Sequence, residues 1–263
     1  ILMKSNYKIV AIGGGEIGGP DNVNGGFLPS DTIAIDKRSI ELTGIKNPKL
    51  LFISTASNDV AGYYETVKRH FIKLGCSEID VLKVAQESPS TDNMRETVFS
   101  HDIVYVGGGN TLHLMNRWRK TGLDKILKEA ACRGIVMTGL SAGSICWFSY
   151  GNSDSRSFTS NSEQLIKVTG IGLIEALHCP HFDSEKSRQN DLKRMMKNTP
   201  KLVAIALDDC AAIEVVGDTY RIIISKDGAK ARRAYWSRGE YILEEIEQQD
   251  EYRGLDELLS KNS

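Results

Sequence analysis

Short apolar runs alternate with longer amphipathic stretches along the first half of the chain. The runs that we predict to be buried strands are Lys8 to Ile12, Lys49 to Ile53, Glu78 to Lys83, Ile103 to Val106 and Gly134 to Thr138. Between them, Asp59 to Leu74 and Leu123 to Cys132 carry apolar residues at the spacing of one helix face. Strands that alternate with helices predict an α/β fold, in which helices cover both faces of a mainly parallel sheet.

The second half of the chain ends this pattern with strands that follow one another directly. Leu202 to Ala206, Ala211 to Val216 and Tyr220 to Ile224 have the composition of strands, and Gly217-Asp218 joins the last two as in a hairpin. We therefore expect a hairpin-like end to the sheet. No proline-rich linker or repeat divides the sequence, so a single domain over residues 1–263 is predicted.

Composition excludes several classes of partner. The 33 Lys and Arg residues nearly balance the 34 Asp and Glu residues, so no net field favours nucleic acid or an anionic membrane. The five cysteines are scattered and form no C-x-x-C pair, which favours reduced thiols in a cytoplasm. We see neither a secretion signal nor a membrane span. The sequence leaves homo-oligomer formation open.

The first candidate for chemistry is the turn Gly139-Leu140-Ser141-Ala142-Gly143. It follows an apolar strand and precedes a stretch that can start a helix, which is the setting of a nucleophile elbow. Glycines flank such a serine because the neighbouring backbone passes too close for a Cβ atom. The Ala142 N–H would then face a developing oxyanion. A tight turn with small residues for packing is the competing interpretation.

A second glycine turn, Val106-Gly107-Gly108-Gly109-Asn110-Thr111, also follows a strand and opens a helix, Leu112 to Lys120. Parallel strands bring both turns to one edge of the sheet, so the Gly109 N–H is expected to pair with that of Ala142 as an oxyanion hole. Asn110, beside this turn, is a candidate for substrate binding. Phosphate binding, or a plain helix cap by Asn110 or Thr111, is the alternative.

A nucleophilic serine needs a base, and five histidines compete for this role. His181 stands on a rigid turn in Pro180-His181-Phe182 and is our choice. His178 follows an apolar segment and is better interpreted as a core histidine. The other three are expected to be solvated; they are His70, His101 and His113.

Two aspartates compete to orient the imidazole of the base. Asp209 ends an apolar strand in Leu207-Asp208-Asp209, so its side chain would be held rigidly. Asp154 lies in Gly151-Asn152-Ser153-Asp154-Ser155, a composition typical of a flexible loop. We prefer Asp209 and keep Asp154 as the second candidate.

Together these motifs resemble the peptidase E family of serine peptidases, which includes aspartyl dipeptidases and cyanophycinase-like enzymes. The resemblance rests on Val106 to Thr111, Gly139 to Gly143 and Pro180 to Phe182 in the family's order, extended by the strand into Leu207-Asp208-Asp209. It implies a class I glutamine-amidotransferase-like α/β sandwich and a serine mechanism with neither metal nor cofactor. It also implies the order Ser141, His181, Asp209, although family members carry Glu where this chain has Asp209. Accounts of the family have also given the aspartate that matches Asp154 the charge-relay role.

The resemblance further implies a substrate class, short peptides that include dipeptides with N-terminal Asp. In aspartyl dipeptidases an arginine upstream of the acid holds the acidic side chain of the substrate, and Arg188 matches it. A guanidinium suits a carboxylate because it donates two parallel hydrogen bonds. Ser184 to Asn198 also has the pattern of an amphipathic surface helix, in which Arg188 would be solvated.

Two other functions compete with a peptidase. Gly13-Gly14-Gly15-Glu16-Ile17-Gly18 satisfies the G-x-G-x-x-G pattern of a nucleotide-binding enzyme, but Gly19-Pro20 breaks the helix that such a site requires. A glycine-rich loop beside the active-site edge explains the pattern better. The second competitor is a non-catalytic binding protein on the same fold, because a fold does not fix function.

Overall fold

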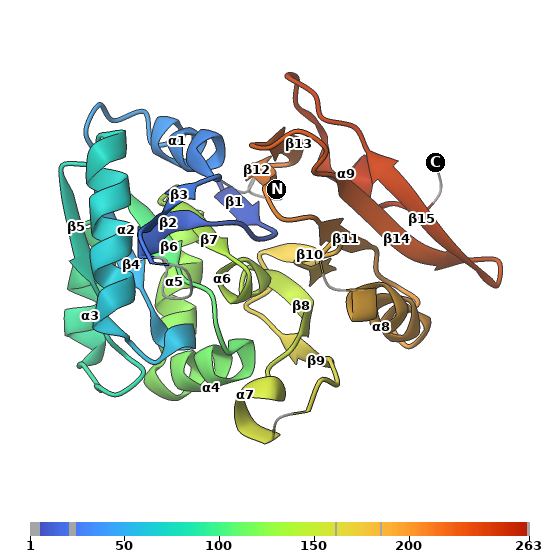
Figure 1. Cartoon of the computed structure of the whole chain (residues 1–263), viewed down its shortest axis with the longest axis horizontal. Helices are drawn as coiled ribbons and strands as arrows, with labels where there is room; N and C mark the ends of the chain where they lie inside the picture. The colour runs from blue at the N-terminus through green and yellow to red at the C-terminus, as the bar shows by residue number, and fades with distance from the viewer. Residues whose placement is uncertain (1–5, 21–24, 161, 185, 262–263) are drawn as a thin grey trace, which may run out of the picture.

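The computed structural model describes residues 6–20, 25–160, 162–184 and 186–261, which form two large sheets with helices around them (Figure 1). The larger sheet has the strand order β16-β13-β12-β1-β7-β6-β4-β5. Its strands are β1 (Lys8–Ile12), β4 (Lys49–Ile53), β5 (Glu78–Val81), β6 (Ile103–Val106), β7 (Val136–Leu140), β12 (Ala211–Val216), β13 (Thr219–Ile224) and β16 (Arg253–Gly254). Strands β1, β7, β6, β4 and β5 run parallel, whereas β12, β13 and β16 add to the edge antiparallel.

The second sheet has the order β15-β14-β11-β10-β8-β9. It consists of β8 (Phe148–Ser153), β9 (Ile166–Thr169), β10 (Ile174–Cys179), β11 (Ala204–Leu207), β14 (Ala231–Ser237) and β15 (Glu240–Ile246). Its central strands β8, β10 and β11 are parallel. A small antiparallel pair, β2 (Ile17–Pro20) and β3 (Phe27–Ser30), follows β1.

Helices pack around the two sheets. They are α1 (Ile33–Glu41), α2 (Ala61–Leu74), α3 (Thr91–Phe99), α4 (Thr111–Thr121), α5 (Leu123–Cys132), α6 (Ala142–Ile145), α7 (Ser157–Ser160), α8 (Lys186–Lys197) and α9 (Leu255–Leu259), with a 3₁₀ turn over Thr55–Ser57. No helix among the described residues is long and apolar enough to cross a membrane.

The alternation of side chains along β1 shows how the layers are built. Val10 and Ile12 pack in one buried cluster with Ile35 of α1 and Phe71 of α2. Ile9 belongs to the cluster on the opposite face, which contains residues of α3, α4 and α5 together with residues of the second sheet. Because successive side chains of a strand point to opposite faces, one strand supports both layers.

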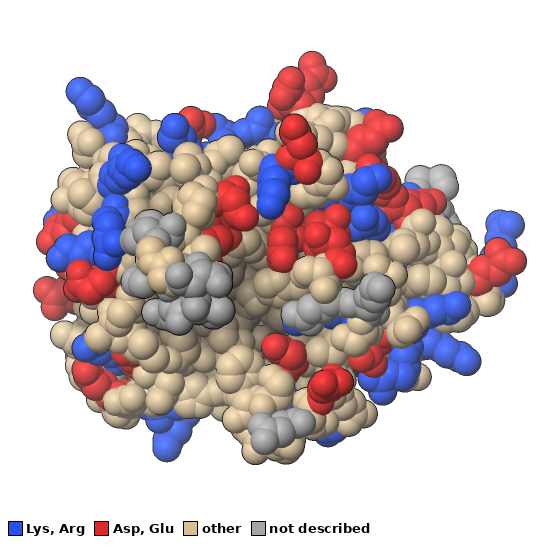
Figure 2. Space-filling model, viewed as in Figure 1, with Lys and Arg blue, Asp and Glu red and all other residues tan. Residues whose placement is uncertain are grey.

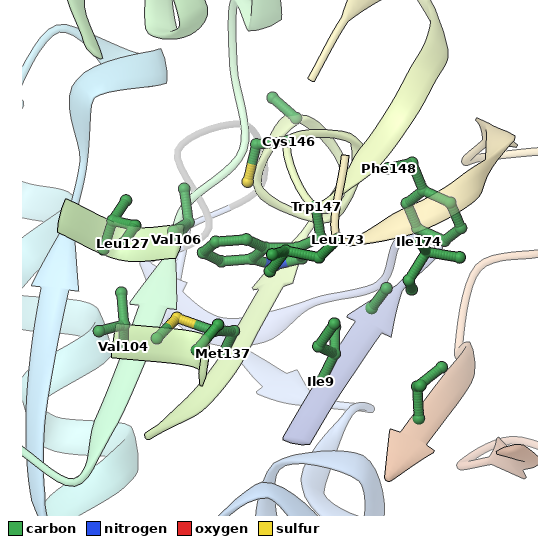
Figure 3. Close-up of a cluster of buried hydrophobic side chains, with 14 of the residues drawn as sticks. Ile9, Val104, Val106, Leu127, Met137, Cys146, Trp147, Phe148, Leu173 and Ile174 are labelled. Atoms are coloured by element: carbon green, nitrogen blue, oxygen red, sulfur yellow. The ribbon is translucent and has the colours of Figure 1, made fainter. Parts of the chain in front are cut away.

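Trp147 marks the contact between the two sheets (Figure 3). It is fully buried and lies directly before β8, among side chains of the first sheet such as Met137 and of the second such as Ile174. On the far face of the second sheet, Leu192 and Met196 of α8 close a third cluster. The two sheets therefore share one core, and the strand ends at their junction are held firmly relative to each other.

The predicted α/β class with a mainly parallel sheet is confirmed. The observed bounds match those predicted from the sequence for β1, β4, β6, β12 and α5. The second sheet was not foreseen, and the strand predicted over Leu202 to Ala206 is β11 of that sheet, so it does not extend the first one. The single domain over residues 1–263 stays a prediction.

Candidate active site

Three strand ends meet where the two sheets join. Ser141 directly follows β7, while His181 and Asp209 each lie two residues beyond the neighbouring parallel strands β10 and β11. The Nε2 atom of His181 lies 2.8 Å from the Oγ atom of Ser141. Its Nδ1 atom lies 2.6 Å from Oδ1 of Asp209. The three side chains thus form one continuous chain of hydrogen bonds.

The backbone at Ser141 has the strain expected of a nucleophile elbow. Its φ of 58° and ψ of −113° are unusual for a residue with a side chain. A Cβ atom on Gly139 would lie 2.4 Å from the Gly143 carbonyl oxygen, and one on Gly143 would lie 2.0 Å from that of Val106. Glycine is therefore required on both sides of the serine. This geometry favours the elbow over a turn that serves packing alone.

The turn that carries His181 is held to the neighbouring strand. His181 has a φ of 76°, and the N–H of the next residue, Phe182, donates to the Leu207 carbonyl at 3.2 Å. The His181 side chain is 20 % exposed, so the imidazole is partly accessible to a substrate.

Asp209 reaches His181 although its side chain is one methylene shorter than the Glu that the resemblance implies at this position. The adjoining loop explains this, because a Cβ on Gly14 would lie 1.9 Å from Asp209 Oδ1 and 2.4 Å from His181 Nδ1. The missing side chain lets the two groups approach each other. The hydrogen bond from His181 lowers the pKa of Asp209. The carboxylate is thereby kept ionised, which suits a partner for an imidazolium.

Asp154 does not take this position. Gly151, Asn152 and Ser153 belong to the buried strand β8, so the flexible loop expected there is wrong. Asp154 follows that strand and is half-buried. Among the described residues, no hydrogen bond joins its carboxylate to His181.

The second glycine turn lies beside the serine. A Cβ on Gly108 would be 3.5 Å from the Cβ of Ser141. Within the described part of the chain, the N–H groups of Gly109 and Ala142 donate no hydrogen bond to the protein. Asn110 caps α4 by accepting a hydrogen bond from the His113 N–H at 3.0 Å. This is the helix cap considered as the alternative to substrate binding, and it already engages the Oδ1 atom of Asn110.

His178 is a core histidine, as predicted. It is fully buried, its ring stacks on Phe148 at 4.6 Å, and it hydrogen bonds the Ser144 hydroxyl and the Ile205 carbonyl. Burial lowers the pKa of His178 to about 3. It is therefore neutral near pH 7, and the hydrogen bond of the Ser141 Oγ atom is to His181 and not to His178.

Arg188 is neither solvated nor exposed to the site. It lies on α8, is only 2 % exposed, and donates from Nη1 to the Asn152 carbonyl at 2.8 Å. The surface position considered for it is therefore wrong. Its charge acts on Asp209, whose pKa it helps to lower.

Comparison with known proteins identifies the family. The sequence profile of peptidase family S51 matches residues 26–223. This chain belongs to peptidase family S51. The uncharacterized peptidase YgaJ of Bacillus subtilis is 32 % identical over 236 residues, which are 89 % of this chain and 94 % of YgaJ. Peptidase E of a Nostoc species is 24 % identical over 190 residues, 68 % of this chain and 73 % of that protein. Membership of S51 makes the chain a peptidase.

Solved structures show the same fold. A peptidase from an acI-B1 Actinobacterium superposes with a TM-score of 0.70 at 18 % identity, covering 95 % of this chain and 98 % of the other. A peptidase E protein from Listeria monocytogenes superposes with a TM-score of 0.62 at 19 % identity, covering 83 % and 98 %. The S51 chain therefore has the peptidase E fold that the resemblance implied.

The glycine-rich loop after β1 belongs to this S51 site. A Cβ on Gly13 would lie 2.4 Å from the Asp208 carbonyl oxygen, and Gly14 lies against His181 and Asp209. The next element is the strand β2, so no helix begins there to bind a pyrophosphate. The nucleotide-site interpretation of this loop is therefore wrong. Sequence reasoning missed the contact of Gly14 with the histidine and the acid, for which the glycine run after β1 was the signal.

An acidic cavity of about 630 Å³ opens beside His181 and Asp209. Four further carboxylates line it, with one ammonium group; these residues are Glu16, Asp31, Asp183, Asp227 and Lys226. Figure 2 shows acidic side chains gathered around the hollow in the middle of this face. Within the described residues, no group of three or more His, Cys, Asp or Glu side chains is arranged to hold a metal ion.

Proposed function

We propose that this S51 peptidase is a serine peptidase that cleaves short peptides through an acyl-enzyme. Ser141 is the nucleophile, His181 the general base and Asp209 the residue that orients the base. The observation that carries the proposal is the continuous hydrogen bonding from the strained Ser141 through His181 to Asp209. A serine, a base within hydrogen-bond reach and a third group that fixes the base are what nucleophilic catalysis requires.

Proton transfer follows from this geometry. The ionised Asp209 accepts from Nδ1–H of His181, so that Nε2 is the basic nitrogen that faces Ser141. Nε2 takes the Oγ proton as Oγ attacks the peptide carbonyl, and the N–H groups of Gly109 and Ala142 stabilise the oxyanion. His181 then protonates the leaving amine. Water, activated by the same histidine, hydrolyses the ester to Ser141.

The negative charge of the acidic cavity indicates which substrate groups it would bind. Its carboxylates favour the free α-ammonium group of a short peptide, which supports action near an amino terminus. An N-terminal Asp adds a carboxylate that needs a cation. Arg188, the candidate for that role, is buried and bound to the Asn152 carbonyl. We therefore propose cleavage near an amino terminus. Selectivity for an N-terminal Asp requires in addition that the Arg188 guanidinium reach the substrate from its buried position.

The experiment is a screen of dipeptides and short oligopeptides, with Asp-Xaa and β-aspartyl substrates included. The Ser141→Ala variant should lose hydrolysis by at least about 10⁴-fold and keep the fold. Ser149→Ala is the matched control, because Ser149 lies on β8 with its hydroxyl on the Ile174 carbonyl. A fluorophosphonate probe should label Ser141 in the native protein. Full activity in Ser141→Ala would disprove the serine mechanism, and an absence of labelling would favour a non-catalytic binder.

Hydrolysis of Asp-Xaa dipeptides, lost on Arg188→Met, would support the aspartyl specificity. Equal turnover of Asp-Xaa and Ala-Xaa peptides would instead assign the amino-terminal preference to the acidic cavity alone.

A further inference from the structure

The glycine turn beside Ser141 is tied at both of its ends, to the end of β4 and to the 3₁₀ turn that follows β4. At the start, the Gly107 N–H donates to the carbonyl of Ile53, the last residue of β4, at 3.1 Å. At the end, the Asn110 N–H donates to the Ala56 carbonyl at 2.8 Å. These two bonds fix where the turn begins and ends. They do not by themselves fix the peptide planes between, because glycine rotates freely about φ and ψ.

The middle of the turn has a third tie, to a side chain. The Gly108 N–H donates to the phenolic oxygen of Tyr63 at 3.2 Å. Of the four N–H groups from Gly107 to Asn110, only that of Gly109 has no acceptor among the described residues. The turn is thus held by three donors, and the fourth is left for a ligand.

Tyr63 itself is held in place by packing. It lies in the first turn of α2, and its ring meets that of Phe52 in β4 edge to face, with the centroids 5.1 Å apart. On its other side, a Cβ on Gly107 would lie only 2.6 Å from its Cε1 atom. The ring therefore lies between a strand side chain and the glycine turn, and its oxygen has a fixed position.

The phenol also has the right protonation state. Burial raises the pKa of Tyr63 to about 12. The group is neutral over the whole range in which a peptidase is assayed, so it accepts the Gly108 N–H without adding a negative charge near the oxyanion. The nearby Glu16 acts in the same direction on this pKa.

We propose that Tyr63 is a positioning residue of the oxyanion hole. By accepting the Gly108 N–H, it fixes the Gly107–Gly108 peptide. Together with the Asn110 tie on the other side, this limits rotation of the Gly108–Gly109 peptide and so aims its N–H at the carbonyl that Ser141 attacks. This inference rests on the proposed serine mechanism. A preorganised donor stabilises the transition state more than the bound substrate, so loss of the tie should lower kcat and leave KM unchanged.

The test is Tyr63→Phe, which removes the oxygen and keeps the ring. Removing an oxyanion donor outright costs about 10²–10³ in kcat, so loosening one should cost about tenfold. We expect kcat to fall about tenfold, KM to stay within twofold, and the rate of fluorophosphonate labelling to fall by the same factor as kcat.

Tyr64→Phe is the matched control. Tyr64 is the next residue of α2, and its hydroxyl donates to the Ile79 carbonyl at 2.9 Å, at the start of β5 and outside the glycine turn. Both variants lose one hydrogen bond to the backbone, but only Tyr63→Phe loses a tie to the site. We expect Tyr64→Phe to keep the native kcat.

The outcomes separate this inference from the proposed function. The positioning role would be overturned if Tyr63→Phe had the same kcat as Tyr64→Phe, or if it had a raised KM with native kcat. The serine mechanism is tested independently by Ser141→Ala. If Tyr63→Phe does not fold, amide hydrogen exchange in the Ser141→Ala protein decides. The Gly108 N–H should be protected and the Gly109 N–H should exchange rapidly, and equally fast exchange at both would refute the tie.

Discussion

At the scale of single residues, the site depends on backbone positions that most residues avoid. Ser141 and His181 both have positive φ, which costs a residue with a side chain about 1–3 kcal/mol. Close contacts around Gly139, Gly143 and Gly14 hold these conformations. A strained serine that points at a histidine is hard to explain by packing alone, and it is the residue-level reason to expect activity.

The choice between the two aspartates can be measured directly. Asp209→Asn should lower kcat by about 10³–10⁴-fold, because an amide neither stabilises the imidazolium nor selects the active tautomer of His181. Asp154→Asn, the control, should change kcat less than threefold, since no described hydrogen bond links Asp154 to His181. A larger loss in Asp154→Asn than in Asp209→Asn would reverse our assignment.

His178 should make the protein sensitive to acid. Its folded pKa is about 3, whereas that of an unfolded histidine is about 6.5. Between these values only the unfolded state binds the proton, so the free energy of unfolding should fall by about 1.4 kcal/mol per pH unit as the pH drops below about 6.5.

Urea unfolding of the wild type and of His178→Gln between pH 7 and pH 4 measures this effect. The wild type should show the steeper loss over that range. Parallel curves for the two proteins would show that His178 does not control the acid response.

The remaining histidines show where residue-level reasoning failed. We expected His70 and His101 to be solvated, but the His70 side chain is largely buried against Asp36 at 2.8 Å, and His101 is buried beside Asp80 at 3.1 Å. Polar neighbours in the sequence did not reveal these partners, because Asp36 and Asp80 come from other elements.

At the scale of elements, the strand-turn-helix unit around Ser141 is set by close backbone contacts. Gly143→Ala would place a Cβ 2.0 Å from the Val106 carbonyl oxygen. We expect the free energy of unfolding to fall by about 2–3 kcal/mol, with loss of activity, because the contact is to backbone that cannot rotate away.

Gly62→Ala is the control for this substitution. A Cβ there, at the start of α2, meets nothing within 4 Å, so the change should raise stability by about 0.5 kcal/mol. Thermal unfolding and kcat check both variants. Native stability in Gly143→Ala would contradict the packing of the elbow.

The strands of the second sheet explain what the sequence pattern missed. In β14 and β15, charged residues such as Arg233 and Glu244 pair across the hairpin, so the apolar signal is diluted. In β8, Gly151 and Asn152 resemble a loop in composition but are buried between two neighbouring strands. Such strands form because of the partner strands and not because of their own apolar period.

At the scale of the whole molecule, a buried ion pair ties the first helix to the late strands. Arg38 of α1 binds the fully buried Glu214 of β12 through two nitrogens, at 2.8 and 3.2 Å. Arg38→Met would leave a buried carboxylate with weaker pairing, so the free energy of unfolding should fall by about 3 kcal/mol. The loss should persist in 1 M NaCl, because salt screens buried pairs poorly.

The surface pair of Arg133 and Glu129 provides the comparison. Arg133 is more than half exposed, so Arg133→Met should cost less than about 1 kcal/mol. Denaturant unfolding of both variants in low and high salt makes the measurement. Equal losses would show that burial does not strengthen the Arg38 pair.

The sequence by itself determined the alternation of strands and helices, the elbow serine with its flanking glycines, and His181 as the candidate base. These follow from side-chain periodicity and from local backbone sterics, both of which depend on residues that are close together in the sequence. Only the tertiary structure decided that Asp209 contacts His181, that Arg188 is buried, and that Tyr63 holds the glycine turn. Each depends on residues far apart in the chain, whose distances are set by which strands pair and how the two sheets pack together.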